Sequence, residues 1–146
     1  MSLLRSGVVR FIGFVRKVEG DISVIEIFRE FSDGLCRLNE FSHAFILYWL
    51  HLRDDEKFRN VLKVHPKGCT DLPEVGVFAS RSPNRPNPIG LTVVELVEVK
   101  NNVLIVKGLD ALPGSPIIDI KPYLKRDCKS RVIQPNWLEK HKKIGM

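Results

Sequence analysis

The feature that most constrains the fold is a series of short β-branched runs separated by turn-forming dipeptides. Residues 89–99 are rich in Val, Leu and Thr, and Asn101-Asn102 separates them from a second apolar run at 103–108. Runs joined by such turns predict antiparallel strands. No long amphipathic helix alternates with these runs, which disfavours a doubly wound sheet. We therefore expect a mainly β fold that closes, fully or partly, into a small barrel.

The start of the chain has the same pattern. Val8–Val18 and Ser23–Phe28 flank the turn-forming pair Gly20-Asp21 and predict a β-hairpin. The apolar run Phe41–His51 predicts a buried strand, with a short helix as the alternative. The charged residues 53–60 predict a surface loop or a helical turn.

Length and composition fit one domain. A chain of 146 residues that is 44% hydrophobic and 27% charged can bury a single core. We expect a β-barrel domain over residues 1–124 and, within the same domain, a short basic tail or helix over 125–146. The longest apolar run, Ala44–Leu50, is far shorter than a membrane helix. Arg10 and Arg16 interrupt the segment that a signal peptide needs, so a cytoplasmic location is expected.

Positive charge is concentrated at the C-terminal end. Acidic and basic residues balance over residues 1–120, whereas eight Lys or Arg face only Asp127 and Glu139 from Lys121 onward and carry the whole formal charge of +6. A basic segment beside a neutral body is typical of proteins that bind a phosphate backbone. The alternative is a solvated tail that binds nothing.

Cysteine and histidine give no sign of a metal site or a disulfide. Cys36, Cys69 and Cys128 are odd in number and far apart, with no Cys-x-x-Cys pair. His43 and His51 share a face of a regular strand, but no acid or cysteine completes a site around them. We therefore predict neither metal nor disulfide.

The most unusual segment is the loop GVFASRSPNRPNPIG at residues 76–90. Three prolines restrain its backbone, so the loop is expected to be stiff. It carries Arg81 and Arg85 among several Ser and Asn side chains, and a stiff loop holds such donors in place before a ligand arrives. This indicates a site for an anionic or polar ligand. The alternative is a rigid surface turn whose arginines pair with neighbouring acids.

Extended to GVFASRSPNRPNPIGLTVVEL, this loop resembles the GVFATRSxxRPNPIG signature of the TsaA-like family, which includes the bacterial tRNA methyltransferase TrmO. Three further blocks are similar to the family: Ile12-Gly13 with Val15-Arg16, residues 34–51, and residues 109–124. The resemblance implies a small TsaA-like β-barrel that forms a homodimer and binds S-adenosylmethionine. It further implies methylation of the exocyclic amine of threonylcarbamoyl-adenosine beside the anticodon of tRNA. The candidate RNA contacts in the basic tail are then Lys125, Arg126, Lys140, Lys142 and Lys143.

The resemblance also implies which residues contact the cofactor. By motif position these are His51, Leu52, Arg81, Leu91, Asp110, Ala111, Leu112 and Pro113. Asp110 would accept hydrogen bonds from the ribose hydroxyls or the amino group, although Asp is also common before a turn such as Pro113-Gly114. For His51 the alternative is a histidine satisfied at a strand end.

A second set of residues is expected to bind substrate or orient the loop: Arg85, Asn87, Asp119, Lys121 and Tyr123. The last three alternate onto one face of an extended segment. In the functional interpretation Asp119 orients a loop arginine, while Lys121 or Tyr123 reaches toward the substrate. In the alternative Asp119 and Lys121 simply pair with each other. The sequence identifies no catalytic base.

Two departures from the family pattern concern the substrate. The proline-arginine-glutamine segment near the start of bacterial members has no match in Val18–Ile27, and the separate C-terminal domain of longer members has no match either. These departures keep two alternatives open. One is a methyltransferase that acts on a small molecule, and the other is a non-catalytic RNA-binding barrel.

Overall fold

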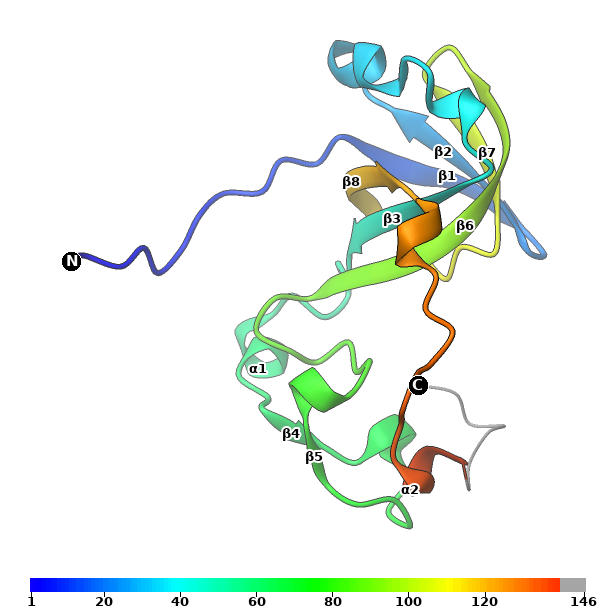
Figure 1. Ribbon diagram of the computed structural model, residues 1–146. Helices are drawn as coiled ribbons and strands as arrows, with labels where there is room; N and C mark the ends of the chain where they lie inside the picture. Colours follow the sequence, from blue (N-terminus) through cyan, green and yellow to red (C-terminus); the bar gives the residue numbers. More distant parts are fainter. Residues whose placement is uncertain (140–146) are drawn as a thin grey trace. The chain divides into compact units, whose positions relative to one another are not determined.

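The structure is a computed structural model that describes residues 1–139 (Figure 1). Its strands are β1 Gly13–Glu19, β2 Ile22–Ile27, β3 His43–Trp49, β4 Lys63–Val64, β5 Val75–Gly76, β6 Ile89–Lys100, β7 Val103–Lys107 and β8 Pro116–Pro122. The helices are short: α1 Glu56–Arg59, α2 Asn136–Glu139 and the 3-10 helices η1 Arg29–Leu35, η2 Leu38–Glu40, η3 Pro66–Gly68, η4 Val77–Ala79 and η5 Lys125–Asp127. The prediction of a mainly β fold is confirmed.

Six strands form a closed antiparallel barrel in the order β1-β2-β7-β6-β3-β8. Along β2 and β3 buried side chains alternate with more exposed ones, as the two-residue period of a strand requires. The inward-facing side chains are mostly β-branched and fully buried, and they include Val15, Ile25, Ile46, Val106 and Ile117. This apolar interior holds the strands in register, because a slip of one residue would turn every apolar side chain outward.

The predicted hairpins are confirmed at both turns. Gly20 has φ 62° between β1 and β2, and Asn101 has φ 55° between β6 and β7. Glycine and asparagine tolerate this left-handed backbone better than other residues. The first strand, however, begins at Gly13 rather than at Val8, because residues 1–11 have no neighbouring strand to pair with.

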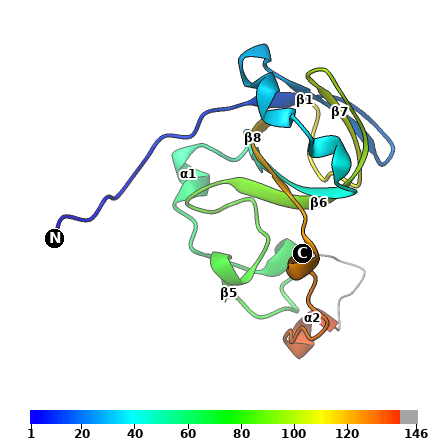
Figure 2. The ribbon, with the colours of Figure 1, turned by 45° about the horizontal axis from the view of Figure 1, so that its top comes forward.

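A segment of two 3-10 helices, η1 and η2, connects β2 to β3 and lies against one end of the barrel (Figure 2). Leu35 and Leu38 are its buried residues. Arg37, between the two helices, has a left-handed backbone with φ 69° and forms an ion pair with Glu40, 2.7 Å from Nε to Oε2. The segment therefore covers the barrel end with two leucines and keeps its charges outside.

By its contacts the chain divides into two compact units. The barrel unit comprises Met1–Trp49 and Gly90–Tyr123, and the second unit comprises Leu50–Ile89 and the chain from Leu124 onward. The second unit contains α1, the two-stranded β4–β5 sheet, the proline-rich loop, η5 and α2. The expected extent of a single barrel domain, residues 1–124, stays a prediction. No helix of the described chain is long and apolar enough to cross a bilayer.

Candidate functional site

The proline-rich loop of the second unit is braced by its own side chains. Nη1 of Arg85 donates to the carbonyl oxygens of Ser80 and Ser82, both at 3.1 Å. The hydroxyl of Ser80 accepts from the backbone N–H of Ser82, and the hydroxyl of Ser82 accepts from that of Asn84, both at 3.2 Å. Arg85, a predicted substrate or orienting residue, thus fixes the curvature of the loop.

The second half of the loop is attached to α1 and to the chain after β3. Nε of Arg59 donates to the carbonyl of Pro86 at 2.8 Å, and its Nη2 lies 3.5 Å from Oδ1 of Asn87. The backbone N–H of Leu50 donates to the carbonyl of Pro88 at 2.7 Å. Asn87 therefore has a structural contact, and its predicted role toward the substrate stays a prediction. These contacts restrain the loop and explain the stiffness that its prolines predict.

The guanidinium of Arg81, unlike that of Arg85, forms no hydrogen bond with the loop backbone. Its side chain is exposed and, within the described chain, it forms no ion pair or hydrogen bond. It lines a pocket of about 480 Å³ together with Arg53 and His65. The braced loop thus holds the backbone of Arg81 in place and leaves its guanidinium available to an anion.

In the barrel unit, Tyr48 links the loop at Asp110 to β6, and each of these segments carries predicted cofactor contacts. Its side chain is 5% exposed, and its hydroxyl donates to the carbonyl oxygen of Asp110. The same hydroxyl lies 3.4 Å from Oγ1 of Thr92, the neighbour of Leu91 on β6. A Cβ on Gly90 would overlap the Tyr48 ring, so glycine is required there. Sequence reasoning missed both Tyr48 and Gly90.

Three leucines that are predicted to contact the cofactor are exposed. Leu91 is 48% exposed and Leu112, in the loop between β7 and β8, is 57% exposed. In the second unit Leu52 is 63% exposed, and His51 beside it is half-buried. Asp110 and Pro113 are exposed and Ala111 is half-buried. Apolar side chains exposed in this way provide surface that an aromatic or apolar part of a ligand can cover.

Asp119 and Lys121 lie on the same face of β8, as expected, and Tyr123 follows the end of the strand. Asp119 lies opposite Leu47 and Lys121 opposite Phe45 on β3. Lys121 Nζ is 3.4 Å from Asp119 Oδ2, which is the pairing named as the alternative. Tyr123 packs edge-on against Phe45 with ring centroids 5.3 Å apart. A role of these three residues toward a loop arginine or the substrate stays a prediction.

The basic C-terminal segment is only partly described. Lys125 and Arg126 are exposed on η5, whose first turn is closed by Asp127 Oδ2 accepting from the N–H of Leu124 at 2.9 Å. Lys140, Lys142 and Lys143 lie outside the described residues. Within the expected basic tail or helix, α2 is described over Asn136–Glu139.

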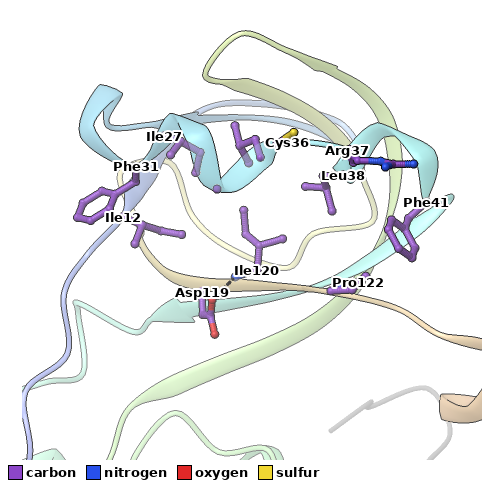
Figure 3. Close-up of a pocket in the computed structure, with 12 residues that line it drawn as sticks. Ile12, Ile27, Phe31, Cys36, Arg37, Leu38, Phe41, Asp119, Ile120 and Pro122 are labelled. Atoms are coloured by element: carbon purple, nitrogen blue, oxygen red, sulfur yellow. Dashed lines mark hydrogen bonds between the residues drawn. The ribbon is translucent and has the colours of Figure 1, made fainter.

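A second pocket lies at the end of the barrel that η1 and η2 cover (Figure 3). It has a volume of about 360 Å³, and apolar side chains such as Ile12, Leu38 and Ile120 form most of its lining. Asp119 also lines it. This pocket was not predicted, because residues 31–40 are mixed in polarity and give no periodic signal.

Metal-binding side chains do not gather anywhere in residues 1–139. No group of three or more His, Cys, Asp or Glu residues there could hold a metal ion. Cys36, Cys69 and Cys128 are free thiols.

Comparison with known proteins gives one family and several relatives. Residues 13–128 match the family described as the tRNA-methyltransferase O N-terminal domain. A protein named "Probable S-adenosyl-L-methionine-binding protein" from Methanothermobacter thermautotrophicus is 54% identical over 101 residues, which are 69% of each chain. The "tRNA (adenine(37)-N6)-methyltransferase" of Rattus norvegicus is 35% identical over 118 residues, which cover 81% of this chain but 26% of that protein.

Two solved structures are similar over most of the chain. A crystal structure of TrmO aligns with a TM-score of 0.69 and 29% identity, over 88% of this chain and 63% of that one. TrmO from Pseudomonas aeruginosa aligns with a TM-score of 0.67 and 26% identity, over 88% and 61%. The chain thus spans a little over three fifths of the length of the solved structures that it matches.

Proposed function

Because the chain belongs to the family of the tRNA-methyltransferase O N-terminal domain, we propose that it uses S-adenosylmethionine to methylate the exocyclic amine of threonylcarbamoyl-adenosine beside the anticodon of tRNA. The observation that carries the proposal is the family match over residues 13–128. Relatives named for S-adenosylmethionine binding and for tRNA methylation support it. With tRNA as substrate, the proposal places the protein in the cytoplasm.

The residues of the barrel unit suit this cofactor. Leu91 and Leu112 offer exposed apolar surface against which an adenine ring can pack. The exposed carboxylate of Asp110 can accept hydrogen bonds from ribose hydroxyls and interact with a positively charged group. The carbonyl of the same residue is held by Tyr48. Apolar and acidic groups together match a ligand that combines an aromatic base, hydroxyls and a net positive charge.

When bound, S-adenosylmethionine supplies an electrophilic methyl group that is attached to a sulfonium. The protein contributes position, because an in-line displacement requires the nucleophile to be held at near-attack distance. Tyr48 serves this purpose by fixing the backbone at Asp110 relative to β6. The attacking amine would form a new N–C bond as the methyl–sulfur bond breaks, the sulfonium would leave as a neutral thioether, and the amine would release a proton. No described side chain is assigned to accept that proton.

A homodimer belongs to the same proposal. Beyond Leu91, β6 carries Val93 and Val97, which are 42% and 54% exposed. Exposed apolar side chains on one strand suit an interface between two copies better than contact with water. Val93→Lys should therefore shift the mass in sedimentation equilibrium from dimer to monomer. Val132→Lys, at a 72% exposed position outside the barrel, is the matched control and should leave the mass unchanged.

A second candidate function keeps the cofactor and changes the substrate to a small molecule. The observation in its favour is that two relatives matched over 69% and 76% of their own length are named only for cofactor binding. The named tRNA methyltransferase, by contrast, is matched over only 26% of its length. The two candidates differ in one measurable respect. Only the first requires that the protein bind tRNA.

Calorimetric titration with S-adenosylmethionine tests the cofactor directly. Wild-type protein should bind it saturably, and Arg81→Ala should weaken binding because it removes a guanidinium from a predicted cofactor contact. Arg29→Ala, at an exposed arginine of η1, is the matched control and should bind as wild type does. Failure of the wild-type protein to bind either the cofactor or its demethylated product would refute the methyltransferase proposal and favour a non-catalytic barrel.

A further inference from the structure

The pocket beside Arg81 is lined by two arginines, Arg53 and Arg81. We call it the arginine pocket and define it by Arg53, His65, Thr70, Arg81 and Ser82, all of the second unit. Its volume is about 480 Å³, and none of the described residues that line it is acidic. Two guanidiniums without a carboxylate between them repel each other, and an anionic ligand relieves that repulsion.

Arg53 is held in place by an aromatic ring. Its guanidinium carbon lies 4.8 Å from the centre of the Phe58 ring on α1. Its backbone N–H donates to the carbonyl of Leu50 at 2.9 Å, which closes the turn after β3. Stacking on a ring restrains a guanidinium and leaves its N–H groups available at the edge. The described chain provides no carboxylate that pairs with Arg53.

His65 adds a polar group of defined orientation. Its Nδ1 lies 3.1 Å from the carbonyl oxygen of Leu72. Since a carbonyl oxygen only accepts, Nδ1 carries a hydrogen, and Nε2 is the nitrogen that remains for a ligand. Exposed Thr70 contributes a hydroxyl donor to the same pocket, whereas Nε2 of a neutral His65 ring accepts. The pocket thus combines two positively charged guanidiniums with a neutral hydroxyl donor.

This charge distribution discriminates between two anionic groups. One guanidinium, such as that of Arg81, can pair with the carboxylate of the proposed cofactor. Because its sulfonium and ammonium make that cofactor a cation overall, a second unpaired guanidinium beside it is unfavourable. An RNA phosphate has no such positive groups, and its two free oxygens match the paired N–H groups of a guanidinium. The pocket is therefore better suited to a phosphate than to the cofactor.

We propose that the arginine pocket binds a backbone phosphate of the RNA substrate, with Arg53 as a phosphate contact that the family motif does not include. This inference rests on the proposed function, because it takes RNA as the substrate. Arg81 belongs both to the predicted cofactor contacts and to this pocket, so its variants do not separate the two ligands. Arg53 separates them, because it is absent from the predicted cofactor contacts.

The test measures the affinity of an anticodon stem-loop RNA by fluorescence anisotropy at several salt concentrations. Loss of one phosphate contact reduces the slope of log K against log salt by about 0.7 to 0.9, which corresponds to about five- to eightfold weaker binding at 0.1 M salt. Arg53→Gln should show both changes and should bind S-adenosylmethionine as tightly as wild type. Arg53→Lys keeps the charge and should retain most of the slope.

Two further variants keep the test valid if Arg53→Gln folds poorly. Thr70→Glu leaves Arg53 in place and adds a carboxylate to the pocket, so it should weaken RNA binding at least as much. Arg29→Gln removes an exposed charge from η1 in the barrel unit and should leave the slope unchanged. Thermal unfolding of each variant shows whether the fold is intact.

Three results would overturn the inference. One is wild-type RNA affinity and slope in both Arg53→Gln and Thr70→Glu. Another is weaker cofactor binding with unchanged RNA binding, which would assign the pocket to the cofactor carboxylate. The third is a wild-type protein that does not bind RNA. By contrast, salt-dependent RNA binding that responds to Arg53 without any methyl transfer would refute the proposed function and leave the pocket assignment standing.

Discussion

Gly90→Ala should disrupt the contact that joins β3, β6 and the loop at Asp110. An added Cβ would overlap Cε2 and Cζ of Tyr48 and lie 2.9 Å from its Cδ2. Tyr48 cannot easily move, because it is 5% exposed and its hydroxyl is bonded to the Asp110 carbonyl. Overpacking of this kind costs about 1–3 kcal/mol, and the lost hydrogen bond adds about 1 kcal/mol. The expected loss in the free energy of unfolding is about 2–4 kcal/mol.

Urea denaturation of wild type and variants measures this loss. Gly76→Ala is the matched control, because the nearest atom to its added Cβ is the carbonyl oxygen of Leu62 at 3.9 Å. Its φ of −63° also suits alanine, so this change should be neutral or stabilise by about 0.4–1 kcal/mol. In the double variant, Tyr48→Leu removes the overlapped ring atoms. The two changes together should therefore cost less than the sum of the single changes.

A Gly90→Ala protein as stable as wild type would refute the reasoning, as would strict additivity with Tyr48→Leu. The same variant should weaken S-adenosylmethionine binding, because a displaced Tyr48 no longer holds the backbone at Asp110. Calorimetry under conditions where the variant is folded measures this second effect.

Two further predictions concern charged residues. Hydrogen bonding from Arg37 lowers the pKa of the Glu40 carboxyl below its usual value, so the stabilising contribution of this pair is present above the usual pKa and is lost as pH falls through the lowered one. NMR titration should detect this low pKa in wild type and its return to the usual range in Arg37→Gln. Neutralising Lys140, Lys142 and Lys143 together should weaken RNA binding and flatten its salt dependence, with cofactor affinity unchanged.

The barrel strands could be predicted because their signals are local. Gly20 and Asn101 mark hairpin turns in the sequence, and both adopt the left-handed backbone that those turns need. The run Ile89–Lys100 was recognised almost to its ends. The start of β1 was placed too early, since the valines before Gly13 have strand propensity but no partner strand.

The division into two units could not be predicted, because it depends on distant contacts. Residues 50–89 lie between β3 and β6 in the sequence, yet these two strands are neighbours in the barrel. No local pattern reveals that Tyr48 would meet Asp110, a residue 62 positions away. For the same reason Gly90 could be recognised as part of a motif but not as a glycine required by a tyrosine ring.

The candidate site shows the same contrast. Proline content alone predicted a stiff loop at Arg81, and the bonds from Arg85 and Arg59 explain that stiffness. The different roles of the two loop arginines could not be predicted, because their sequence surroundings are nearly equivalent. Arg53 belongs to no motif that the sequence analysis recognised. Its contact with Phe58 could not be predicted, because it depends on how the chain after β3 folds.

The most direct test of the central claim is nucleoside mass spectrometry of tRNA after incubation with the protein and S-adenosylmethionine. The tRNA should come from cells that lack this methylation but still make threonylcarbamoyl-adenosine. The account predicts that this nucleoside gains the mass of one methyl group in the presence of wild-type protein, and that Arg81→Ala reduces the yield. Saturable cofactor binding without any change in tRNA nucleosides would contradict the account and direct attention to a small-molecule substrate.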